Sequence, residues 1–509
     1  MPESIAIETV IEAFLQKARE LNLLHERDHL YTRNRLLALL GRDNFTASQV
    51  ENWDASWLEL LDLLVHDAKA RAVIPEGVAA ADEFVAQVMD LFMPLPSRLE
   101  ENFWTRVQED PKKATDYFYG LARVSDYIKT RRIEKNIGFE AASPYGNLEL
   151  TINLSKPEKT QEEISKAKAQ ESQSYPTCAL CFENEGYVGR PGYPARSNHR
   201  LVHLTLADGT YGFQYSPYVY YPEHCIVIKE EHTPMRINGV TFQNLLAFVE
   251  QFPHYFLGSN ADLPGVGGSI LSHEHYQGGH HQFPMDQAPV KIPVQFPKYP
   301  AVKAGLLHWP MAVLRLESQN KEAILHLAQD ILAAWQTYDD AERNILAETK
   351  GERHNTVTPI ARFVEGTYIL NIVLRNNRTT PEYPGGIFHP HPRLHHIKQE
   401  NIGLIEVMGL AILPPRLEAE LGTVAAYLGG QAPLEACQAY HRTWAQALKK
   451  KYQPQESQVQ QVLEAALGER FVEILTDAGV FKPDAYGEAG FCAFVESMGG
   501  HCLPSRFVN

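Results

Sequence analysis

The sequence has few cysteines for its length, no long apolar run and no excess of positive charge. Six cysteines in 509 residues are too few for a disulfide scaffold, and a chain this long buries a sufficient core without one. The 47 lysines and arginines are outnumbered by 62 aspartates and glutamates, for a formal net charge of -15. This balance argues against nucleic acid or an anionic membrane as the main partner, since both select basic surfaces. It does not exclude a small anionic substrate.

The N-terminus also lacks a targeting signal. Its first segment, MPESIAIETVIEAF, carries three glutamates and no basic region. The longest apolar candidate, residues 402–413, contains Glu406 and is shorter than the roughly 18 residues that a membrane span needs. These absences predict a cytoplasmic protein with reduced thiols.

Both ends of the chain are predicted to be helical. In residues 1–140, apolar side chains recur at helical spacing and give the segments amphipathic faces. The same period returns after Pro414 and predicts a second helical region over residues 416–509. The expected N-terminal helices include 7–18, 58–73 and 81–92.

Strands dominate the middle of the chain and occur in two similar series. A first half, residues 141–299, contains β-rich segments and then a helix over 240–252. A second half, residues 300–415, repeats the order of strands, a helix over 320–338, and strands. This order predicts two related α+β halves. The expected strands are 200–207, 210–221, 224–231, 306–317, 358–363, 366–377 and 402–413.

The most informative segment is DLPGVGGSILSHEHYQGGHHQF, which spans residues 262–283. Its first part is rich in glycine, so that backbone N–H groups can approach and bind an anion closely. Gly267, Gly268 and Ser269 are therefore candidates for binding the phosphate groups of a substrate.

A row of polar side chains follows this loop. His273, His275 and Gln277 are spaced at i, i+2 and i+4, which puts them on one face of an extended strand. A neutral imidazole nitrogen can attack a phosphoryl group if its other nitrogen is protonated and held by an acceptor. Gln277 can donate to a phosphoryl oxygen without titrating, which favours group transfer over hydrolysis. Satisfied polar residues at a strand end are the alternative, and the flanking glycines argue against it.

Cys178 and Cys181 form a Cys-x-x-Cys pair, which is typical of half a metal site or of a redox pair. The pair lies between a polar stretch and a loop rich in glycine and proline, which favours a metal. Zinc would need two further ligands, and spacing alone does not select them. The candidates are His199, His203, His224, Cys225 and His273.

A histidine cluster follows Pro384-Gly385-Gly386. It fits a second metal site or a phosphate-binding loop with Arg393, and it fits equally a histidine-rich surface loop. The cluster consists of His389, His391, His395 and His396.

The segment DLPGVGGSILSHEHYQGG, residues 262–279, resembles the signature of the class II galactose-1-phosphate uridylyltransferases. One position departs, because the family prefers a β-branched aliphatic residue at Gly265. The central region resembles the class I enzymes and the histidine-triad superfamily more loosely. The resemblance implies an α+β fold of two histidine-triad-like halves with antiparallel sheets, extended by helices at both ends.

The resemblance also implies a reaction of galactose catabolism, in the Leloir pathway. UDP-glucose would uridylylate His275 and release glucose 1-phosphate, and galactose 1-phosphate would then take the UMP group. His275 matches the nucleophile of the family motif, and Gln277 matches the glutamine that stabilises the uridylylated state. The expected partners are these two substrates, with neither nucleic acid nor membrane; a homo-oligomer is left open.

A structural zinc ion is implied as well. His273 matches a class I zinc ligand, and Cys178 and Cys181 resemble the class I zinc cysteines. The segment YYPEHCIVI resembles the one with the remaining ligand, which points to His224. A closed site with these four ligands would fix the chain two residues before His275.

Other family features carry over less closely. Asn371 and Val373 stand on the strand that best matches the histidines of the second, iron site of class I, so the resemblance leaves a second metal open. The segment SPYGNLELTINLSK resembles a class I strand whose basic residue meets phosphate, which indicates Lys156. Asn198 and Asn260 are candidates for nucleotide contacts.

Two rival functions fit the same residues. A phosphorylase would form the same intermediate on His275 but use inorganic phosphate as acceptor, so that acceptor use separates it. A zinc-stabilised sensor would bind a sugar nucleotide without turnover, and an isolable uridylyl-protein adduct would exclude it.

Overall fold

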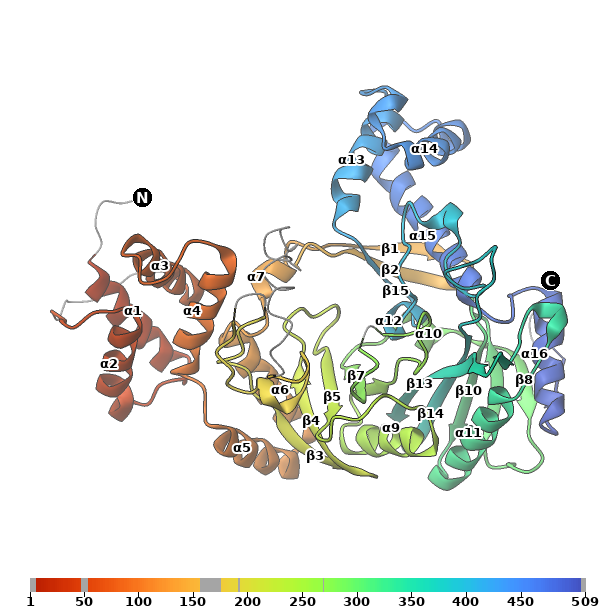
Figure 1. The fold of residues 1–509 in the computed structure, drawn as a ribbon, viewed down its shortest axis with the longest axis horizontal. Coiled ribbons are helices and arrows are strands. Elements are labelled where there is room, and N and C mark those ends of the chain that lie inside the picture. Colours follow the sequence, from red (N-terminus) through yellow and green to blue (C-terminus); the bar gives the residue numbers. More distant parts are fainter. Residues whose placement is uncertain (1–5, 47–53, 156–174, 191–192, 269, 505–509) are drawn as a thin grey trace. The chain divides into compact units, whose positions relative to one another are not determined.

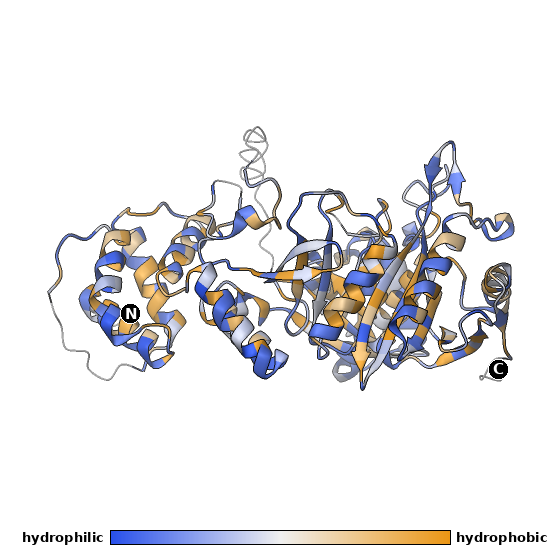
Figure 2. Cartoon of the chain, turned by 90° about the horizontal axis from the view of Figure 1, so that it is seen from below, coloured by the Kyte–Doolittle hydropathy of each residue, from blue (hydrophilic) through white to orange (hydrophobic). Residues whose placement is uncertain are grey.

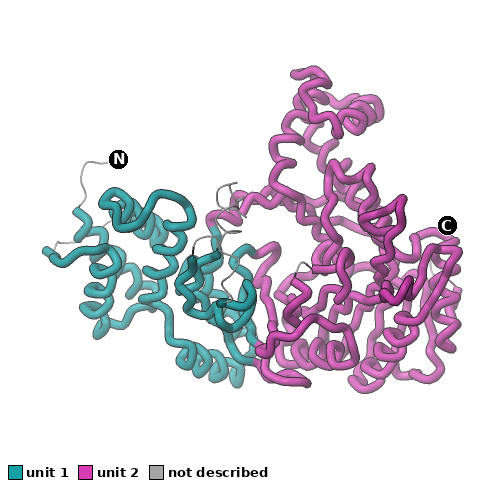
Figure 3. Tube along the Cα trace, viewed as in Figure 1, with its two compact units in different colours: residues 1–130, 157–203, 212–218 teal, residues 131–156, 204–211, 219–509 magenta. Residues whose placement is uncertain are grey.

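The computed structural model describes residues 6–46, 54–155, 175–190, 193–268 and 270–504, and its fold is drawn in Figure 1. The chain forms two compact units (Figure 3). Unit 1 comprises residues 1–130, 157–203 and 212–218, and unit 2 comprises residues 131–156, 204–211 and 219–509. The polar stretch 156–174 lies outside the described residues.

Unit 1 begins with a helical bundle, as the periodicity predicts. Its core contains an aromatic cluster in which Phe14 stacks on Trp57 with 4.0 Å between ring centroids, and Phe92 meets both rings edge-on. The Ser56 hydroxyl and the Glu59 carboxylate form a capping box that starts the third helix. The helices are α1 (Ile7–Glu20), α2 (His29–Leu39), α3 (Trp57–Ala70), α4 (Val78–Asp90), α5 (Pro96–Glu109), α6 (Pro111–Val124) and, next along the chain, α7 (Thr130–Ile133).

The central feature is a large sheet with the strand order β16-β8-β9-β10-β14-β13-β6-β7-β5-β4-β3. The pairings from β16 to β5 are all antiparallel. The strands are β3 (Val202–Leu206), β4 (Gly209–Tyr215), β5 (Cys225–Lys229), β6 (Phe256–Gly258), β7 (His275–Gly279), β8 (Val290–Gln295), β9 (Lys303–Leu307), β10 (Val313–Ser318), β13 (Asn355–Val364), β14 (Thr367–Asn376) and β16 (His501–Cys502).

The strand order confirms that the chain contains two related α+β halves. Counted outward from the β6–β13 pair, one series reads β6, β7, β5, β4, β3 and the other reads β13, β14, β10, β9, β8. Each series has its helix at the same place, since α9 (Gly239–Gln251) joins β5 to β6 and α11 (Lys321–Gln336) lies between β10 and β13. The predicted helices over 240–252 and 320–338 are thereby confirmed. The predicted domain boundaries after residues 140, 299 and 415 stay predictions.

Helices and a second, smaller sheet complete unit 2. Helices α9 and α11 contact each other and the strands of the large sheet (Figure 1). In the smaller sheet, β2 (Gly146–Ile152) pairs antiparallel with β1 (Ile137–Ser143) and parallel with β15 (Leu410–Leu413). The remaining elements are α10 (Pro284–Gln287), β11 (Glu348–Thr349), β12 (Glu352–Arg353), α12 (Leu404–Val407), α13 (Arg416–Leu428), α14 (Ala439–Tyr452), α15 (Val459–Ala478) and α16 (Ala485–Ser497).

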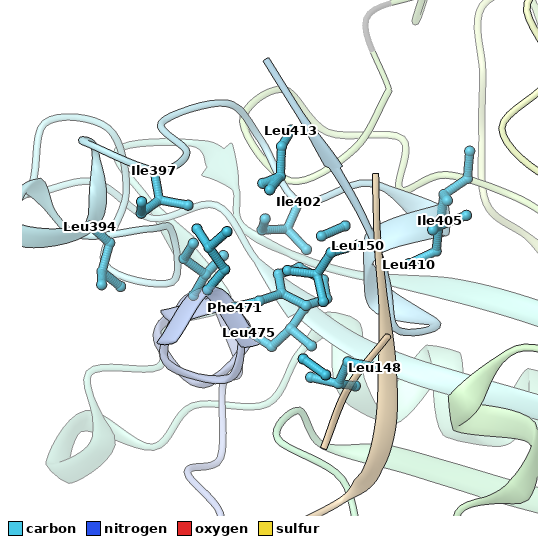
Figure 4. Packing of buried hydrophobic residues seen from close by; sticks show 14 of the residues in the cluster. Leu148, Leu150, Leu394, Ile397, Ile402, Ile405, Leu410, Leu413, Phe471 and Leu475 are labelled. Carbon is cyan, nitrogen blue, oxygen red and sulfur yellow. The ribbon is translucent and has the colours of Figure 1, made fainter. Parts of the chain in front are cut away.

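A buried apolar cluster joins the smaller sheet to the C-terminal helices. Leu148 and Leu150 from β2 pack with Leu410 from β15 and with Phe471 and Leu475 from α15 (Figure 4). Figure 2 shows apolar residues along the strands and on the helices of this unit. In the described parts of the chain, no helix is both long and apolar enough to cross a membrane. The cytoplasmic location stays a prediction.

Two segments predicted as single strands are divided. Residues 402–413 form the short helix α12 and then β15, with a turn at Gly409, whose φ is +104°. Residues 306–317 contain the end of β9 and most of β10, separated by a turn that includes Pro310, which has no N–H for a strand pairing. A short apolar run does not by itself distinguish a strand from a buried helix or from two elements.

The prediction of reduced thiols is wrong for two of the six cysteines. Cys492 in α16 and Cys502 in β16 form a disulfide, with their Cα atoms 5.7 Å apart. That separation is within the range that a disulfide bridges. The two cysteines come this close because the chain turns back from the helix to the strand within ten residues. The bond fastens the last helix to the edge strand β16, which pairs with β8.

Candidate active site

His275 is the first residue of β7 and is buried, with 4% of its surface exposed. Its Nδ1 atom lies 2.8 Å from the backbone oxygen of His273. A carbonyl oxygen can only accept, so Nδ1 carries the proton and donates it, and the basic lone pair is on Nε2. This is the state that a nucleophilic imidazole requires.

The alternation of β7 puts His275 and Gln277 on the sheet face opposite to α9. Between them, Tyr276 points toward α9, where its hydroxyl accepts from Asn244 Nδ2 at 3.1 Å. Gln277 pairs across the sheet with Gly258 of β6, which has no side chain to cover it. Gln277 is partly exposed, so its carboxamide can meet a substrate.

His224 contacts Gln277 directly. Its Nε2 atom lies 3.2 Å from Oε1 of Gln277, and the ring is 4% exposed. Burial lowers the pKa of His224 to about 4, so the imidazole is neutral at neutral pH. The residue predicted as a zinc ligand therefore lies beside the predicted catalytic glutamine.

The glycine-rich loop lies against Asn260. A Cβ atom at Gly267 would be 2.5 Å from the Ala261 oxygen, and one at Gly268 would be 3.0 Å from Nδ2 of Asn260. These close approaches require glycine at the first position and leave little room at the second. Asn260 is buried, and its Oδ1 accepts from the Leu404 N–H at 2.9 Å, which ties the loop to the start of α12.

Of the other predicted substrate contacts, Asn198 is among the described residues. Asn198 is buried in unit 1, and its Nδ2 donates to the Ser125 oxygen at 2.8 Å, so this amide holds its own segment in place. Lys156 and Ser269 lie outside the described residues.

A group of potential metal ligands contains two of the four predicted zinc residues. Cys178, His232 and His273 each offer one ligand atom, and these atoms lie within 4.8 Å of one another. The rings of His232 and His273 are 4.1 Å apart, and Nε2 of His273 lies 2.7 Å from the Lys229 oxygen. A His/Cys group that could bind a metal is thus present, and it includes His232, which was not among the predicted ligands.

The register of the sheet explains why His232 and not His224 meets His273. Strands β5 and β7 are antiparallel, with Ile228 opposite His275. Residues that follow β5 therefore return toward residues that precede β7, whereas His224 precedes β5 and lies at the other end of the pair. A histidine shortly after β5 was the signal in the sequence, but its use needs the strand pairing.

Cys181 lies beside Cys178, and its Sγ accepts from the Cys178 N–H at 3.4 Å. The pKa of the Cys181 thiol is raised, first by its hydrogen bond to the Cys178 thiol and then by burial. A metal ion would replace the thiol protons, since thiolates are the form that binds metals. Two thiolates and two imidazoles are a donor set that suits zinc.

Arg375 is a further charged residue near this face that the sequence reasoning did not select. It lies on β14 with 1% exposure, and its NH2 group donates to the Ile402 oxygen at 2.8 Å. Burial lowers the pKa of its guanidinium to about 10. The signal in the sequence was an arginine within an apolar strand segment, because a charged side chain is rarely buried unless it is paired.

The histidine cluster at 389–396 packs its own loop and the neighbouring C-terminal helices. Three of its imidazoles have acceptors within the loop, at 3.1, 2.8 and 3.2 Å. No group of three potential metal ligands within the described residues includes them. The contacts are His391 with the Ile387 oxygen, His395 with the Pro390 oxygen, His389 with Asn401, and His396 with the rings of His441 and Trp444.

The buried pair of His396 and His441 predicts acid-sensitive stability. Burial lowers the pKa of His396 to about 4 and lowers that of His441, against an ordinary histidine pKa of 6.5. The unfolded chain then binds more protons, so the free energy of unfolding falls as the pH drops from about 6.5 toward 4. We expect the melting temperature to fall over this range and to fall less steeply in a His396→Gln variant. An equal slope in both proteins would contradict the assignment.

Two family models match the chain. The model described as "Galactose-1-phosphate uridyl transferase, N-terminal domain" matches residues 22–234, and that of the C-terminal domain matches residues 248–446. The matched ranges include the glycine-rich loop, β7 and both cysteines of the Cys-x-x-Cys pair.

Similar proteins align with most of the chain. The "Galactose-1-phosphate uridylyltransferase" of Lactiplantibacillus plantarum is 50% identical over 473 residues, which are 93% of this chain and 96% of the relative. The protein of the same name from Ligilactobacillus salivarius is 47% identical over 495 residues, 96% of this chain and 98% of the relative. Among solved structures, yeast Ap4A phosphorylase Apa2 is 12% identical with a TM-score of 0.30, covering 58% of this chain and 88% of that chain.

Proposed function

Because the chain belongs to the galactose-1-phosphate uridylyltransferase family, we propose that it transfers the uridylyl group of UDP-glucose to galactose 1-phosphate through a covalent intermediate on His275. The observation that carries the mechanism is the bond from Nδ1 of His275 to the His273 oxygen. It leaves Nε2 as the nucleophilic atom, on the face that also presents Gln277.

In the first half-reaction, the Nε2 lone pair attacks the phosphorus atom of the uridylyl group. The bond from that phosphorus to the bridging oxygen breaks, and glucose 1-phosphate leaves with the electron pair. Because the leaving group is a phosphate, it needs no proton from a general acid. The His273 carbonyl stabilises the positive charge that the uridylylated ring carries at Nδ1–H.

In the second half-reaction, a phosphate oxygen of galactose 1-phosphate attacks the same phosphorus, and the bond to His275 breaks. Gln277 donates an amide hydrogen to a phosphoryl oxygen in both steps. A carboxamide does not titrate, so it neither protonates the leaving group nor activates water. This favours an intermediate that persists until the second substrate arrives.

The glycine-rich loop supplies a place for the phosphate groups. Glycine at Gly267 and Gly268 lets the backbone pass close to Ala261 and Asn260, and backbone N–H groups in such loops bind anions. The net charge of -15 is no obstacle, because a local site of this kind compensates the substrate charge.

The proposal includes a structural zinc ion, held by Cys178, Cys181, His232 and His273. Nε2 of His273 lies 2.7 Å from the Lys229 oxygen, a contact that orients this imidazole. His232 replaces His224, which the family resemblance implied, in this ligand set. When bound, the ion would restrain His273, two residues before His275, and it would supply no step of the reaction.

The acceptor tests this function against a phosphorylase. We expect UDP-glucose labelled in the uridylyl phosphate to leave label on the protein, and galactose 1-phosphate to remove it as UDP-galactose. Inorganic phosphate at the same concentration should remove the label far more slowly. Faster release by phosphate would identify a phosphorylase, and no label on the protein at all would exclude the covalent route.

A further inference from the structure

The contact between His224 and Gln277 is not explained by the zinc site or by the transfer steps. We propose that His224 is a positioning residue, which holds the Gln277 carboxamide with its NH₂ group directed at the transferring phosphoryl group. The inference rests on the proposed function, because it assigns the orientation of a group within that site.

The sheet register fixes the two side chains as neighbours. Ile226 on β5 lies opposite Gln277 on β7, so His224, two residues before Ile226, is on the same face and diagonal to Gln277. Cys225 pairs with Gly278, so the residue beyond it, Gly279, faces His224 without a side chain. The distance from Nε2 to Oε1 is 3.2 Å, which is a hydrogen bond.

Aromatic rings hold the His224 imidazole in place. The ring of Tyr221 lies 4.6 Å from it, and that of Tyr220 lies 5.6 Å from it. Tyr221 is itself anchored, because its hydroxyl donates to the Gly278 oxygen at 3.1 Å. A Cβ atom at Gly279 would be 2.7 Å from the Tyr221 ring, so glycine there makes room for this arrangement.

The tautomer of His224 follows from its two nitrogens. Nδ1 is buried and has no hydrogen-bond partner among the residues that the structure describes. A buried lone pair without a partner costs less than a buried N–H without one, so the proton belongs on Nε2. Nε2–H then donates to Oε1 of Gln277.

This bond selects one of two orientations of the carboxamide. If the amide were flipped, its NH₂ group would donate to Nε2, and the His224 proton would be left unpaired on Nδ1. The flipped amide would also turn its oxygen toward the phosphoryl oxygens, where two acceptors repel. The low pKa of His224 is consistent with the same neutral tautomer at neutral pH.

Two amide replacements of His224 separate the roles of its nitrogens. The Nε2 of a glutamine side chain can stand where Nε2 of histidine stands, whereas the Nδ2 of asparagine stands near the Nδ1 position. We expect His224→Leu and His224→Asn to slow formation of the uridylyl-protein about 10- to 100-fold in single-turnover labelling with UDP-glucose. His224→Gln should recover the rate to within about threefold of the wild type. Equal rates in the Asn and Gln variants would overturn the proposal.

A double-mutant cycle shows whether the effect passes through Gln277. In a Gln277→Ala background there is no carboxamide to orient, so His224→Leu should change the single-turnover rate by less than about twofold. A loss in that background as large as in the wild type would mean that His224 supports the fold and does not position Gln277. If the wild-type protein forms no adduct, the proposed function fails; if it forms one and His224→Leu is as fast, only this inference fails.

Discussion

The His275→Gly variant should take up no label from UDP-glucose, and its overall uridylyltransferase activity should fall by about 10³-fold or more. The variant lacks the nitrogen that we propose forms the bond to phosphorus. The contact of Nδ1 with the His273 oxygen favours the tautomer that the proposed attack by Nε2 requires. The measurement is labelling of the protein, followed by peptide mapping of the wild-type adduct.

His280→Gly is the matched control for this experiment. His280 follows β7 directly, is exposed, and contacts the Glu223 carboxylate at 3.3 Å through Nδ1. Its loss should leave labelling within about twofold of the wild type, because surface substitutions of this kind have small effects. Full labelling of the His275→Gly variant would refute the nucleophile assignment, and the mapped peptide would then identify the residue that carries the group.

Removal of a metal ligand is expected to have the second large effect. The purified protein should contain about one zinc ion per chain, and Cys178→Ser or His232→Asn should lower that content and the melting temperature together. The reason is that metal binding stabilises the folded ligand segments, so the free energy of binding contributes to the free energy of folding. Elemental analysis and thermal unfolding measure the two quantities independently.

His224→Asn is the control that distinguishes the two possible ligand sets. In the structure His224 bonds to Gln277, so this variant should retain its zinc while losing uridylylation rate. His232→Asn should have the opposite effect. It should lower the zinc content, and it should reduce the uridylylation rate only because the protein is less stable. A full zinc content in Cys178→Ser would reject the site, and zinc loss in His224→Asn with retention in His232→Asn would restore the set predicted from the sequence.

Residue spacing and helical periodicity predicted those elements whose signal lies within one segment of the sequence. The spacing predicted one strand face for His273, His275 and Gln277. His275 and Gln277 lie on β7, whereas His273 lies in a bend before it, so that part of the prediction is wrong. Helical periodicity located α9 and α11. The proposed metal ligands depend on which strand lies beside β7, and no single segment of the sequence contains this information. His224 and His232 flank the same strand β5, and only its antiparallel register decides between them.

Tertiary contacts also explain a difference between the predicted and the observed secondary structure. Residues 402–413 have the composition of a strand, but a short helix forms at Leu404, whose side chain lies 2.8 Å from where a Cβ of Gly258 would be. That contact forms because Gly258 leaves a gap in the sheet surface. The glycine is visible in the sequence, whereas its partner more than a hundred residues away is not.

The pairing of β6 with β13 prevents β6 from being an exposed edge strand of the first half. β6 has only three residues, all buried, and without β13 it would be an edge strand with unpaired backbone groups. Exposed edges of this kind invite pairing with other chains. The second half has no histidine on β14, the counterpart of β7, yet its backbone closes the edge on which Gly258 and the loop after it depend. The second half therefore supplies the backbone partner that β6 would otherwise lack.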